Sequence, residues 1–255
     1  MLKAERQYHI VEFVNQEKVA SVEELSVHLK ASKATIRRDL EELNRKGVLI
    51  RTHGGATSKE NPGGDGDELP ITIRSQLNRV GKEAVARAAV DLLKEGATVF
   101  IGPGSTARLF SEKLGKFHNL TVLTNDIDVA KEVSKTDNPL VVTGGQLKKN
   151  SCTLHGFFTE QMLQEIKVDI AFMSADAVNL KSGFMDIGVD EITIKRMVLH
   201  NAKQRVMLCD SGKFKASAFV HICEISDVDV IVTNHDIDPE IEAQLTEANI
   251  QVVYE

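Results

Sequence analysis

The sequence predicts an α/β protein in two parts, a small N-terminal winged helix-turn-helix and a larger C-terminal α/β domain. Three observations predict this organisation. Residues 21–56 carry helix caps, apolar periods and glycines in the order of two helices and a wing. Residues 58–70, SKENPGGDGDELP, interrupt every apolar period and are typical of a linker. Beyond them, short β-branched runs alternate with helical patterns. We therefore expect domains at residues 1–57 and 71–255.

The first helix of the N-terminal pair is predicted to begin after Ser21. Ser21 and Glu24 have the spacing of a capping box, in which the hydroxyl accepts from a free amide and the carboxylate reaches back. Three apolar residues then fall on one helical face: Val22, Leu25 and Leu29. Lys30 and Ala31 form a tight connection to the next helix.

The second helix is predicted to begin after Ser32, whose hydroxyl can cap it. Its apolar positions recur at i, i+4 and i+7: Ile36, Leu40 and Leu43. The side chains that point outward are cationic or carry a hydroxyl: Lys33, Thr35, Arg37 and Arg38. Two short helices with such side chains early in the second one are typical of a recognition helix in a major groove. Double-stranded DNA is therefore the expected partner, contacted by these four residues and by Ser32.

A small wing is predicted after the second helix. Gly47 is placed to end the helix, and residues 48–52 have the β-branched content of a strand that leads to a turn at Gly54 and Gly55. Arg51 and His53 lie on this wing and are further candidates for DNA contact. Any amphipathic helix exposes arginines, but the order of cap, turn, helix, glycine and strand favours DNA binding over an ordinary helical surface.

The distribution of charge supports this assignment. The chain of 255 residues has a net charge of −6, which by itself argues against nucleic acid. Residues 1–57 nevertheless hold 10 Lys and Arg against 8 Asp and Glu, whereas the rest holds 21 against 29. Any DNA is therefore expected on the N-terminal part.

The cysteines and the apolar runs exclude other classes of protein. Cys152, Cys209 and Cys223 are too few and too irregularly spaced for a disulfide framework or a structural zinc site, so no metal and no cofactor is expected. Cys152 and His155 form a CxxH pair, but without a second pair a structural role is favoured. No apolar run approaches the ~20 residues that cross a bilayer, and residues 1–10 lack a signal-peptide core. We expect a cytoplasmic protein with no membrane partner.

The larger domain is predicted to contain a largely parallel sheet with helices on both faces. Its strands are expected at residues 98–101, 121–123, 140–143, 170–173, 205–209, 230–232 and 251–254. Its helices are expected at residues 80–94, 107–114, 127–133, 159–165, 191–201 and 239–248.

Ligands of such sheets bind outside the carboxyl ends of the strands, so the residues that follow each strand predict the site. After the first strand, the glycines of GPGST admit an anion to the backbone and its hydroxyls add donors at a helix start, which indicates phosphate: Gly102, Gly104, Ser105 and Thr106. Polar or flexible residues follow the other strands: Asn125, Gly144, Asp176, Asp210 and Lys213. Turn chemistry, helix capping or an exposed charge also explains each of them singly. Together they predict a cleft for a phosphorylated polyol.

Residues 1–57, above all ATIRRDLEELNRKGVLIRTHGGA, resemble the winged helix-turn-helix of the DeoR family of bacterial repressors. In that family the IRRDL segment lies on the recognition helix, which implies DNA contact by Thr35, Arg37 and Arg38 and, less directly, by Lys33. Asp39 is expected to orient an arginine or to accept a backbone contact.

The segments EGATVFIGPGSTARLF, LTVLTND, VVTGGQLKKNS, VDIAFMSADAV and VMLCDSGKF resemble the DeoR-type sensor domain, which is similar in fold to ribose-5-phosphate isomerase. The resemblance implies phosphate contact by Gly104, Ser105 and Thr106. It also implies contacts to the sugar by Asn125, Asp176, Lys195, Asp210 and Lys213. The chain departs from the family pattern at Pro103, which lacks an acidic neighbour, and at Ala177 and Gly212, which leaves the identity of the effector open.

The sequence therefore predicts a repressor of a carbohydrate-utilisation operon, released from DNA by a phosphorylated sugar or polyol. Activation in place of repression stays open. A sugar-phosphate isomerase is the alternative, since GPGST also resembles the phosphate loop of that enzyme, but no second catalytic base is evident and an isomerase has no use for residues 1–57. Paired half-sites in DNA predict a homo-oligomer, either a dimer or a tetramer.

Overall fold

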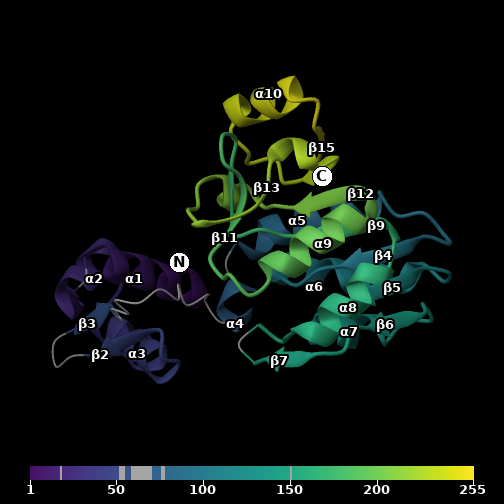
Figure 1. The fold of residues 1–255 in the computed structure, drawn as a ribbon. Coiled ribbons are helices and arrows are strands. Elements are labelled where there is room, and N and C mark those ends of the chain that lie inside the picture. Colours follow the sequence, from purple (N-terminus) through teal and green to yellow (C-terminus); the bar gives the residue numbers. More distant parts are fainter. Residues whose placement is uncertain (18, 52–54, 59–70, 76–77, 150) are drawn as a thin grey trace. The chain divides into compact units, whose positions relative to one another are not determined.

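The computed structural model describes every residue except 18, 52–54, 59–70, 76–77 and 150 (Figure 1). The chain divides into two compact units, Met1–Leu77 and Asn78–Glu255. His53 and the predicted linker, residues 58–70, fall outside the described residues apart from Ser58.

The N-terminal unit contains the predicted pair of helices together with elements that the sequence patterns do not predict. Its helices and strands are α1 (Lys3–Glu17), β1 (Val19–Ser21), α2 (Val22–His28), α3 (Lys33–Arg45), β2 (Leu49–Arg51), β3 (Gly55–Ser58) and α4 (Ile71–Arg74). The apolar faces of α1, α2 and α3 meet in one core around Ile10, Val14, Leu25, Leu40 and Leu43, none of which is exposed. Burial of these faces stabilises helices too short to persist alone.

Local hydrogen bonds set the ends of α2 and α3 as the sequence predicts. The Ser21 hydroxyl accepts from the Glu24 amide at 3.1 Å while the Glu24 carboxylate accepts from the Ser21 amide at 2.8 Å, which is a capping box. Lys30, at φ 48°, turns the chain toward Ser32, which caps α3. Gly47 follows the helix at φ 72°, a conformation that favours glycine.

The wing brings Gly55 against β1. The strands form an antiparallel sheet in the order β1-β3-β2, and Gly55 is the first residue of β3 and pairs with Ser21. A side chain at Gly55 would place its Cβ 2.0 Å from the Ala20 carbonyl oxygen. Gly55 is therefore required by the close approach of β1, and the other glycine of the predicted turn, Gly54, lies outside the described residues.

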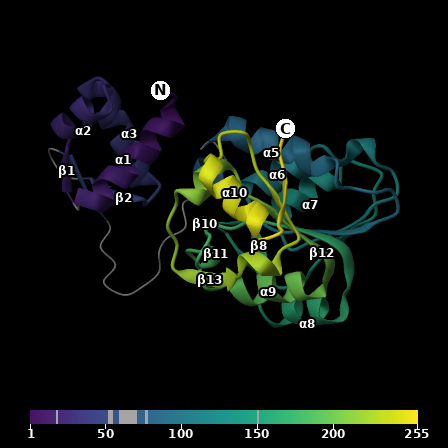
Figure 2. The same cartoon turned by 90° about the horizontal axis from the view of Figure 1, so that it is seen from above.

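The larger unit is built on one seven-stranded parallel sheet in the order β15-β14-β12-β9-β4-β5-β6 (Figures 1 and 2). All seven predicted strands are confirmed: β4 (Thr98–Ile101), β5 (Thr121–Thr124), β6 (Leu140–Val142), β9 (Val168–Met173), β12 (Ala202–Leu208), β14 (Val230–Val232) and β15 (Gln251–Val253). Neighbouring strands pair in parallel throughout.

Helices cover both faces of this sheet, as predicted. They are α5 (Arg79–Val90), α6 (Ser105–Ser111), α7 (Ile127–Val133), α8 (Phe157–Glu165), α9 (Ile192–Asn201) and α10 (Pro239–Glu247), with short 3-10 turns at Leu114–Lys116, Ser211–Phe214 and Ile225–Asp227. Alternate residues of each strand point to opposite faces, so Val99 and Ile101 pack with α5, α6 and α7 while Phe100 packs with α8, α9 and α10. None of the helices among the described residues is long and apolar enough to span a membrane.

Two small antiparallel sheets at the strand ends are absent from the sequence prediction. One is the hairpin of β7 (Gln146–Lys148) and β8 (Thr153–His155); the other joins β10 (Ala177–Asn179), β11 (Gly183–Asp186) and β13 (Val220–Cys223). Their strands have only three or four residues. These strands lack the continuous apolar runs of the large sheet, as in Gln146-Leu147-Lys148 and Thr153-Leu154-His155, so no strand pattern marks them.

The strand order reverses beside β4. The chain passes outward from β4 to β5 and β6, then returns to β9 on the other side of β4. The Gly102 amide donates to the Phe172 carbonyl at 2.8 Å, so the segments that leave β4 and β9 begin side by side. Such a switch point is where open α/β sheets bind ligands.

Candidate functional site

The exposed face of α3 carries two arginines with no partner in the described part of the chain. Arg37 and Arg38 are exposed, and no hydrogen bond or ion pair to a described residue holds either guanidinium. On the opposite face of the helix, Ile36, Leu40 and Leu43 are fully buried. The predicted separation of outward cations from an inward apolar stripe is therefore present.

The other predicted DNA-contact residues that the structure describes make contacts within the N-terminal unit. The Ser32 hydroxyl accepts from the Thr35 amide at 3.2 Å and lies 2.8 Å from the Thr35 hydroxyl, so both hydroxyls serve the helix cap. Lys33 pairs with Glu23 of α2. Arg51 lies 3.2 Å from Glu41 in an exposed pair. Exposed pairs of this kind contribute little to stability, so phosphate can displace them.

Asp39 is the buried charge of the recognition helix. Its side chain is 2% exposed and accepts from Arg6 Nε of α1 at 2.5 Å and from Gln7 Nε2 at 3.4 Å. The expectation that Asp39 orients an arginine is confirmed, and that arginine is Arg6.

The glycine-rich loop after β4 leads into α6 at the switch point. Gly104 stands immediately before the helix at φ 138°, a conformation that favours glycine, and a Cβ at this position would lie 3.5 Å from Ser174 Cβ after β9. Gly102 is packed against the Met173 sulfur, which leaves no room for a side chain. Ser105 and Thr106 are both buried in the first turn of α6.

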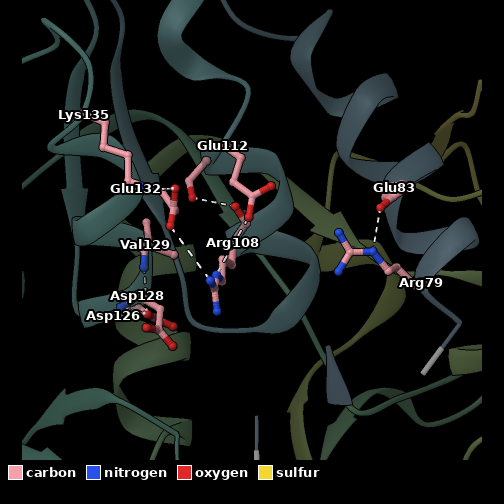
Figure 3. Close-up of polar contacts among 10 residues, drawn as sticks. Arg79, Glu83, Arg108, Glu112, Asp126, Asp128, Val129, Glu132 and Lys135 are labelled. Carbon is pink, nitrogen blue, oxygen red and sulfur yellow. Dashed lines mark hydrogen bonds and ion pairs between the residues drawn. The ribbon is translucent and has the colours of Figure 1, made fainter. Parts of the chain in front are cut away.

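A carboxylate lies next to this loop. Asp126 caps α7 by accepting from the amides of Asp128 at 2.7 Å and Val129 at 3.0 Å (Figure 3). Burial raises the pKa of Asp126 to about 6, against hydrogen bonds from those amides and from the Gly104 amide, which lower it. The Gly104 amide of the predicted phosphate loop therefore faces an internal carboxylate. The nearby Arg108 of α6 lies 3.9 Å from both Glu112 and Glu132.

Asn125 is fully buried between β5 and α7. Its Nδ2 donates to the Leu154 carbonyl at 3.2 Å, while Oδ1 has no hydrogen-bond partner among the described residues. A buried amide oxygen without a donor is costly, and a ligand hydroxyl is one group that satisfies it.

Asp176, Lys195 and Lys213 come together after β9. Lys195 is buried, and its Nζ donates to Asp186 Oδ2 at 2.5 Å and to the Ser174 carbonyl at 2.9 Å. Burial opposes its charge, but Asp186, Glu191 and Asp176 together raise the pKa of Lys195 above its ordinary value. Lys213 Nζ lies 3.6 Å from Asp176 Oδ1. This cluster therefore places two lysines beside the switch point, each paired with a carboxylate.

Asp210 lies two residues after β12, immediately before the 3-10 turn Ser211–Phe214. Its Oδ1 accepts from Asn78 Nδ2 at 2.6 Å and from the Gly212 amide at 3.1 Å, whereas Oδ2 is buried without a partner among the described residues. Ser174 Oγ donates to the Leu208 carbonyl at 3.2 Å, which joins the ends of β9 and β12. Asp210, which follows β12, therefore lies at the same edge of the sheet as the residues that follow β9.

Gly144 does not join these residues through any contact in the described structure. It is exposed after β6, the edge strand two places from β4, and its carbonyl accepts from Thr159 Oγ1. Conversely, Asp186 and Asn78 belong to the cluster although no sequence pattern predicts them. Asp186 lies on β11 of a short antiparallel sheet, so no strand-end pattern marks it, and Asn78 lies before α5.

Two family models match the chain. The DeoR-like helix-turn-helix domain matches residues 6–61, and the DeoR C-terminal sensor domain matches residues 77–235.

Curated relatives match over nearly the whole chain. The HTH-type transcriptional regulator GlpR of Haloferax volcanii is 33% identical over 99% of this chain and 98% of its own length. The glycerol-3-phosphate regulon repressor of Escherichia coli is 28% identical over 99% of both chains. The putative aga operon transcriptional repressor of Escherichia coli is 29% identical over 98% of this chain and 93% of its own length.

Among solved structures, ribose 5-phosphate isomerase A of Methanocaldococcus jannaschii matches with 28% identity and a TM-score of 0.41. The match covers 54% of this chain and 55% of the isomerase.

Proposed function

Because the chain belongs to the DeoR family of transcriptional regulators, we propose that it is a DNA-binding repressor released from its operator by a phosphorylated sugar or polyol. Two features of the described residues carry the proposal. Arg37 and Arg38 have no partner among these residues and lie exposed on α3, and the strand-end cluster contains buried polar atoms without described partners beside the buried Lys195. Operator DNA and phosphorylated metabolites both occur in the cytoplasm, where we expect the protein to act.

The DNA contacts of this proposal come from α3 and the wing. Arg37 and Arg38 are free to meet guanine edges or phosphates, and Lys33, Thr35 and Arg51 lie near them on the same unit. Ser32 fixes the helix start, and His53 remains a proposed contact from the wing. The positive balance of residues 1–57 supports the approach of a polyanion to this unit.

The effector in this proposal binds at the switch point. Its phosphate meets the loop of Gly102, Gly104, Ser105 and Thr106, where amides and hydroxyls converge at a helix start. Asp126 does not prevent this because its pKa of about 6 lets an arriving anion shift it to the neutral acid at modest cost.

The hydroxyl groups of the effector find acceptors and cations on the neighbouring segments. Asn125 Oδ1 and Asp210 Oδ2 are buried without partners in the described structure, and Lys195 and Lys213 supply charge near Asp176. A relative named for glycerol 3-phosphate supports a small phosphorylated polyol as the class of ligand. Gly144 is the weakest member of the proposed site, since it lies at the sheet edge.

Self-association is part of the same proposal, because repression generally needs two half-sites held by a symmetric oligomer. Four apolar side chains are exposed around β6, the β7–β8 hairpin and the start of α8: Val142, Leu147, Phe157 and Phe158. An exposed apolar cluster beside an edge strand is typical of an interface. We assign the homo-oligomer contact to this surface.

No catalytic step belongs to the proposal. The Lys195 amine is held by Asp186 and the Ser174 carbonyl, and one Asp176 oxygen accepts from the Ile187 amide at 3.1 Å. These groups are arranged to bind and not to transfer a proton between two carbons. Turnover of ribose 5-phosphate at enzymatic rates by the purified protein would contradict this assignment.

The mechanism is a linkage between two ligands. An effector that prefers the conformation unable to fit paired half-sites lowers the population of the DNA-binding form. Operator DNA must then weaken effector binding by the same factor. Equal effector affinity with and without operator would remove this mechanism.

A thermal-shift screen against phosphorylated sugars and polyols tests the function directly. A compound that binds only the folded protein raises the melting temperature by mass action. We expect a hit among the phosphorylated compounds, no shift with their dephosphorylated forms, and release of operator DNA by the same hit. A hit that leaves operator binding unchanged would refute the regulatory role.

A further inference from the structure

The Asn78 side chain connects the first residue of the larger unit to the strand-end cluster. Asn78 Nδ2 donates to Asp210 Oδ1 at 2.6 Å, a contact between residues 132 apart in the chain. The Gly212 amide donates to the same oxygen at 3.1 Å. These two donors fix the carboxylate and leave Asp210 Oδ2 buried without a partner in the described part of the chain.

The backbone at Asn78 is held in an uncommon conformation. Its φ of 44° and ψ of 41° lie in the left-handed region, which asparagine tolerates better than most side chains. Asn78 also occupies the cap position of α5, yet its side chain makes no capping bond. A Cβ at Gly81 would lie 2.8 Å from both terminal atoms of Asn78, so that glycine makes room for it. The local sequence therefore favours the contact with Asp210 over a helix cap.

We propose that Asn78 has two roles. It positions Asp210 for the effector, and through this contact effector binding alters the chain where the two units are connected. This inference rests on the proposed function. Leu77 ends the DNA-binding unit and Asn78 begins the sensor unit, so a change at Asn78 acts directly on the connection. An effector hydroxyl that donates to Asp210 Oδ2 adds a third donor to the carboxylate that Asn78 already holds, so occupancy of the site is coupled to the side chain of Asn78.

Helix α5, which follows Asn78, has a second connection to the site through its packing on α6. Val85, Ala88 and Ala89 of α5 share a buried core with Ala107 and Phe110 of α6. α6 begins at the Gly104 loop, to which the proposed function assigns the phosphate. The two ends of the effector thus meet groups that contact α5 at different points, Asp210 at Asn78 before its first residue and α6 along its later turns.

Asn78→Gly tests the inference, because glycine retains the left-handed backbone and removes only the side chain. Asn249→Gly is the matched control, since Asn249 is exposed at φ 57° in the turn between α10 and β15. The full-length proteins are compared by operator affinity, with and without saturating glycerol 3-phosphate, ribose 5-phosphate or fructose 1-phosphate. The operator is a duplex selected by the wild-type protein from random sequences. At a saturating concentration every variant is fully occupied, so a difference in release does not arise from weaker effector binding.

We expect the wild type and Asn249→Gly to lose operator affinity by about 5- to 150-fold with the active compound, the usual range of coupling. Asn78→Gly should retain the basal operator affinity and lose most of that factor. Release of Asn78→Gly equal to wild type, or equal loss of release in Asn249→Gly, overturns the inference and leaves the proposed function standing. A wild type that no compound releases overturns the proposed function itself.

A second variant keeps the test decisive if Asn78→Gly unfolds. Asn78→Asp is isosteric and tolerates the same backbone, but it replaces the donor with a carboxylate facing Asp210. We expect it to retain basal operator binding and to lose release as Asn78→Gly does. Normal release in a folded Asn78→Asp overturns the inference.

Discussion

Arg6 Nε of α1 lies 2.5 Å from Asp39 Oδ2 of α3, so the first helix is tied to the recognition helix by a charged hydrogen bond. The Asp39 side chain is 2% exposed and that of Arg6 14%. Asp39 thus holds α1 against the helix that carries Arg37 and Arg38, the two arginines that we propose contact DNA.

Asp39→Ala should destabilise the N-terminal unit by about 1.5 to 3 kcal/mol, because it removes a hydrogen bond to a charged group and leaves Arg6 unpaired. Chemical denaturation monitored on that unit measures the change. Glu23→Gln is the control, since it breaks only the exposed pair with Lys33 and should leave the midpoint unaltered. An equal midpoint for Asp39→Ala and wild type would show that the buried pair is not stabilising.

Arg37→Ala should weaken specific operator binding by about 1 to 3 kcal/mol if the guanidinium reads a base. The fold should be preserved because Arg37 is exposed and has no partner among the described residues. Titration of labelled operator at fixed salt measures the loss, and Lys94→Ala, an exposed cation of the sensor unit, controls for lost charge. Unchanged affinity of Arg37→Ala would assign DNA contact to another surface.

The seven strands of the large sheet could be predicted from sequence because parallel strands covered by helices form continuous apolar runs, most clearly in the central strands β4 and β9. The capping residues Ser21 and Ser32 were equally informative, since the bonds that they make are local. The hairpin of β7 and β8 could not be predicted, because its strands mix polar and apolar residues and are held by contacts such as that of Thr153 with Glu191. The close contact of Gly55 with β1 could not be predicted for a similar reason: β1 approaches this glycine from another part of the chain.

The candidate site was predictable to the extent that parallel strands end at one edge. Asp176, Asp210 and the Gly104 loop follow strands, and the strand order beside β4 brings their segments to that edge. Asp186 was not predictable because it lies on a short strand outside the large sheet, and Asn78 was not predictable because its partner is 132 residues away. Asp186 pairs with Lys195, and Asn78 reaches Asp210.

Replacing both Ser105 and Thr106 by Ala should preserve operator binding and blunt release by the effector. The two hydroxyls stand at the start of α6, where a phosphate would accept from them. Fluorescence competition with the compound found by the thermal-shift screen measures release. Ser111→Ala is the matched control, since this buried hydroxyl lies at the other end of α6 and donates to the Arg108 carbonyl at 2.7 Å. Normal release by the double variant would rule out the phosphate assignment.

Phe158→Glu should convert the oligomer into monomers, because Phe158 is 70% exposed within the apolar surface around β6 and a charge there opposes burial. Operator affinity should fall with it, since two half-sites would no longer be held together. Light scattering after size exclusion measures the mass, and Phe219→Glu, 63% exposed before β13, is the control. An unaltered mass for Phe158→Glu would place the interface elsewhere.

Asp126 gives the stability of the sensor unit a defined pH dependence. Burial raises the pKa of its carboxyl from 3.8 to about 6 in the folded protein, so the folded state binds more protons than the unfolded state between those values. Its contribution to stability is therefore present below about pH 4 and is lost as the pH rises to about 6, by about 3 kcal/mol over two pH units.

Asp126→Asn removes the titration and retains a side chain that caps α7. The variant should gain stability relative to wild type as the pH is raised from 4 to 7, measured by denaturation at each pH. A constant difference between the two proteins across that range would mean that the carboxyl is not desolvated, and phosphate would then meet a charged Asp126 beside the Gly104 loop.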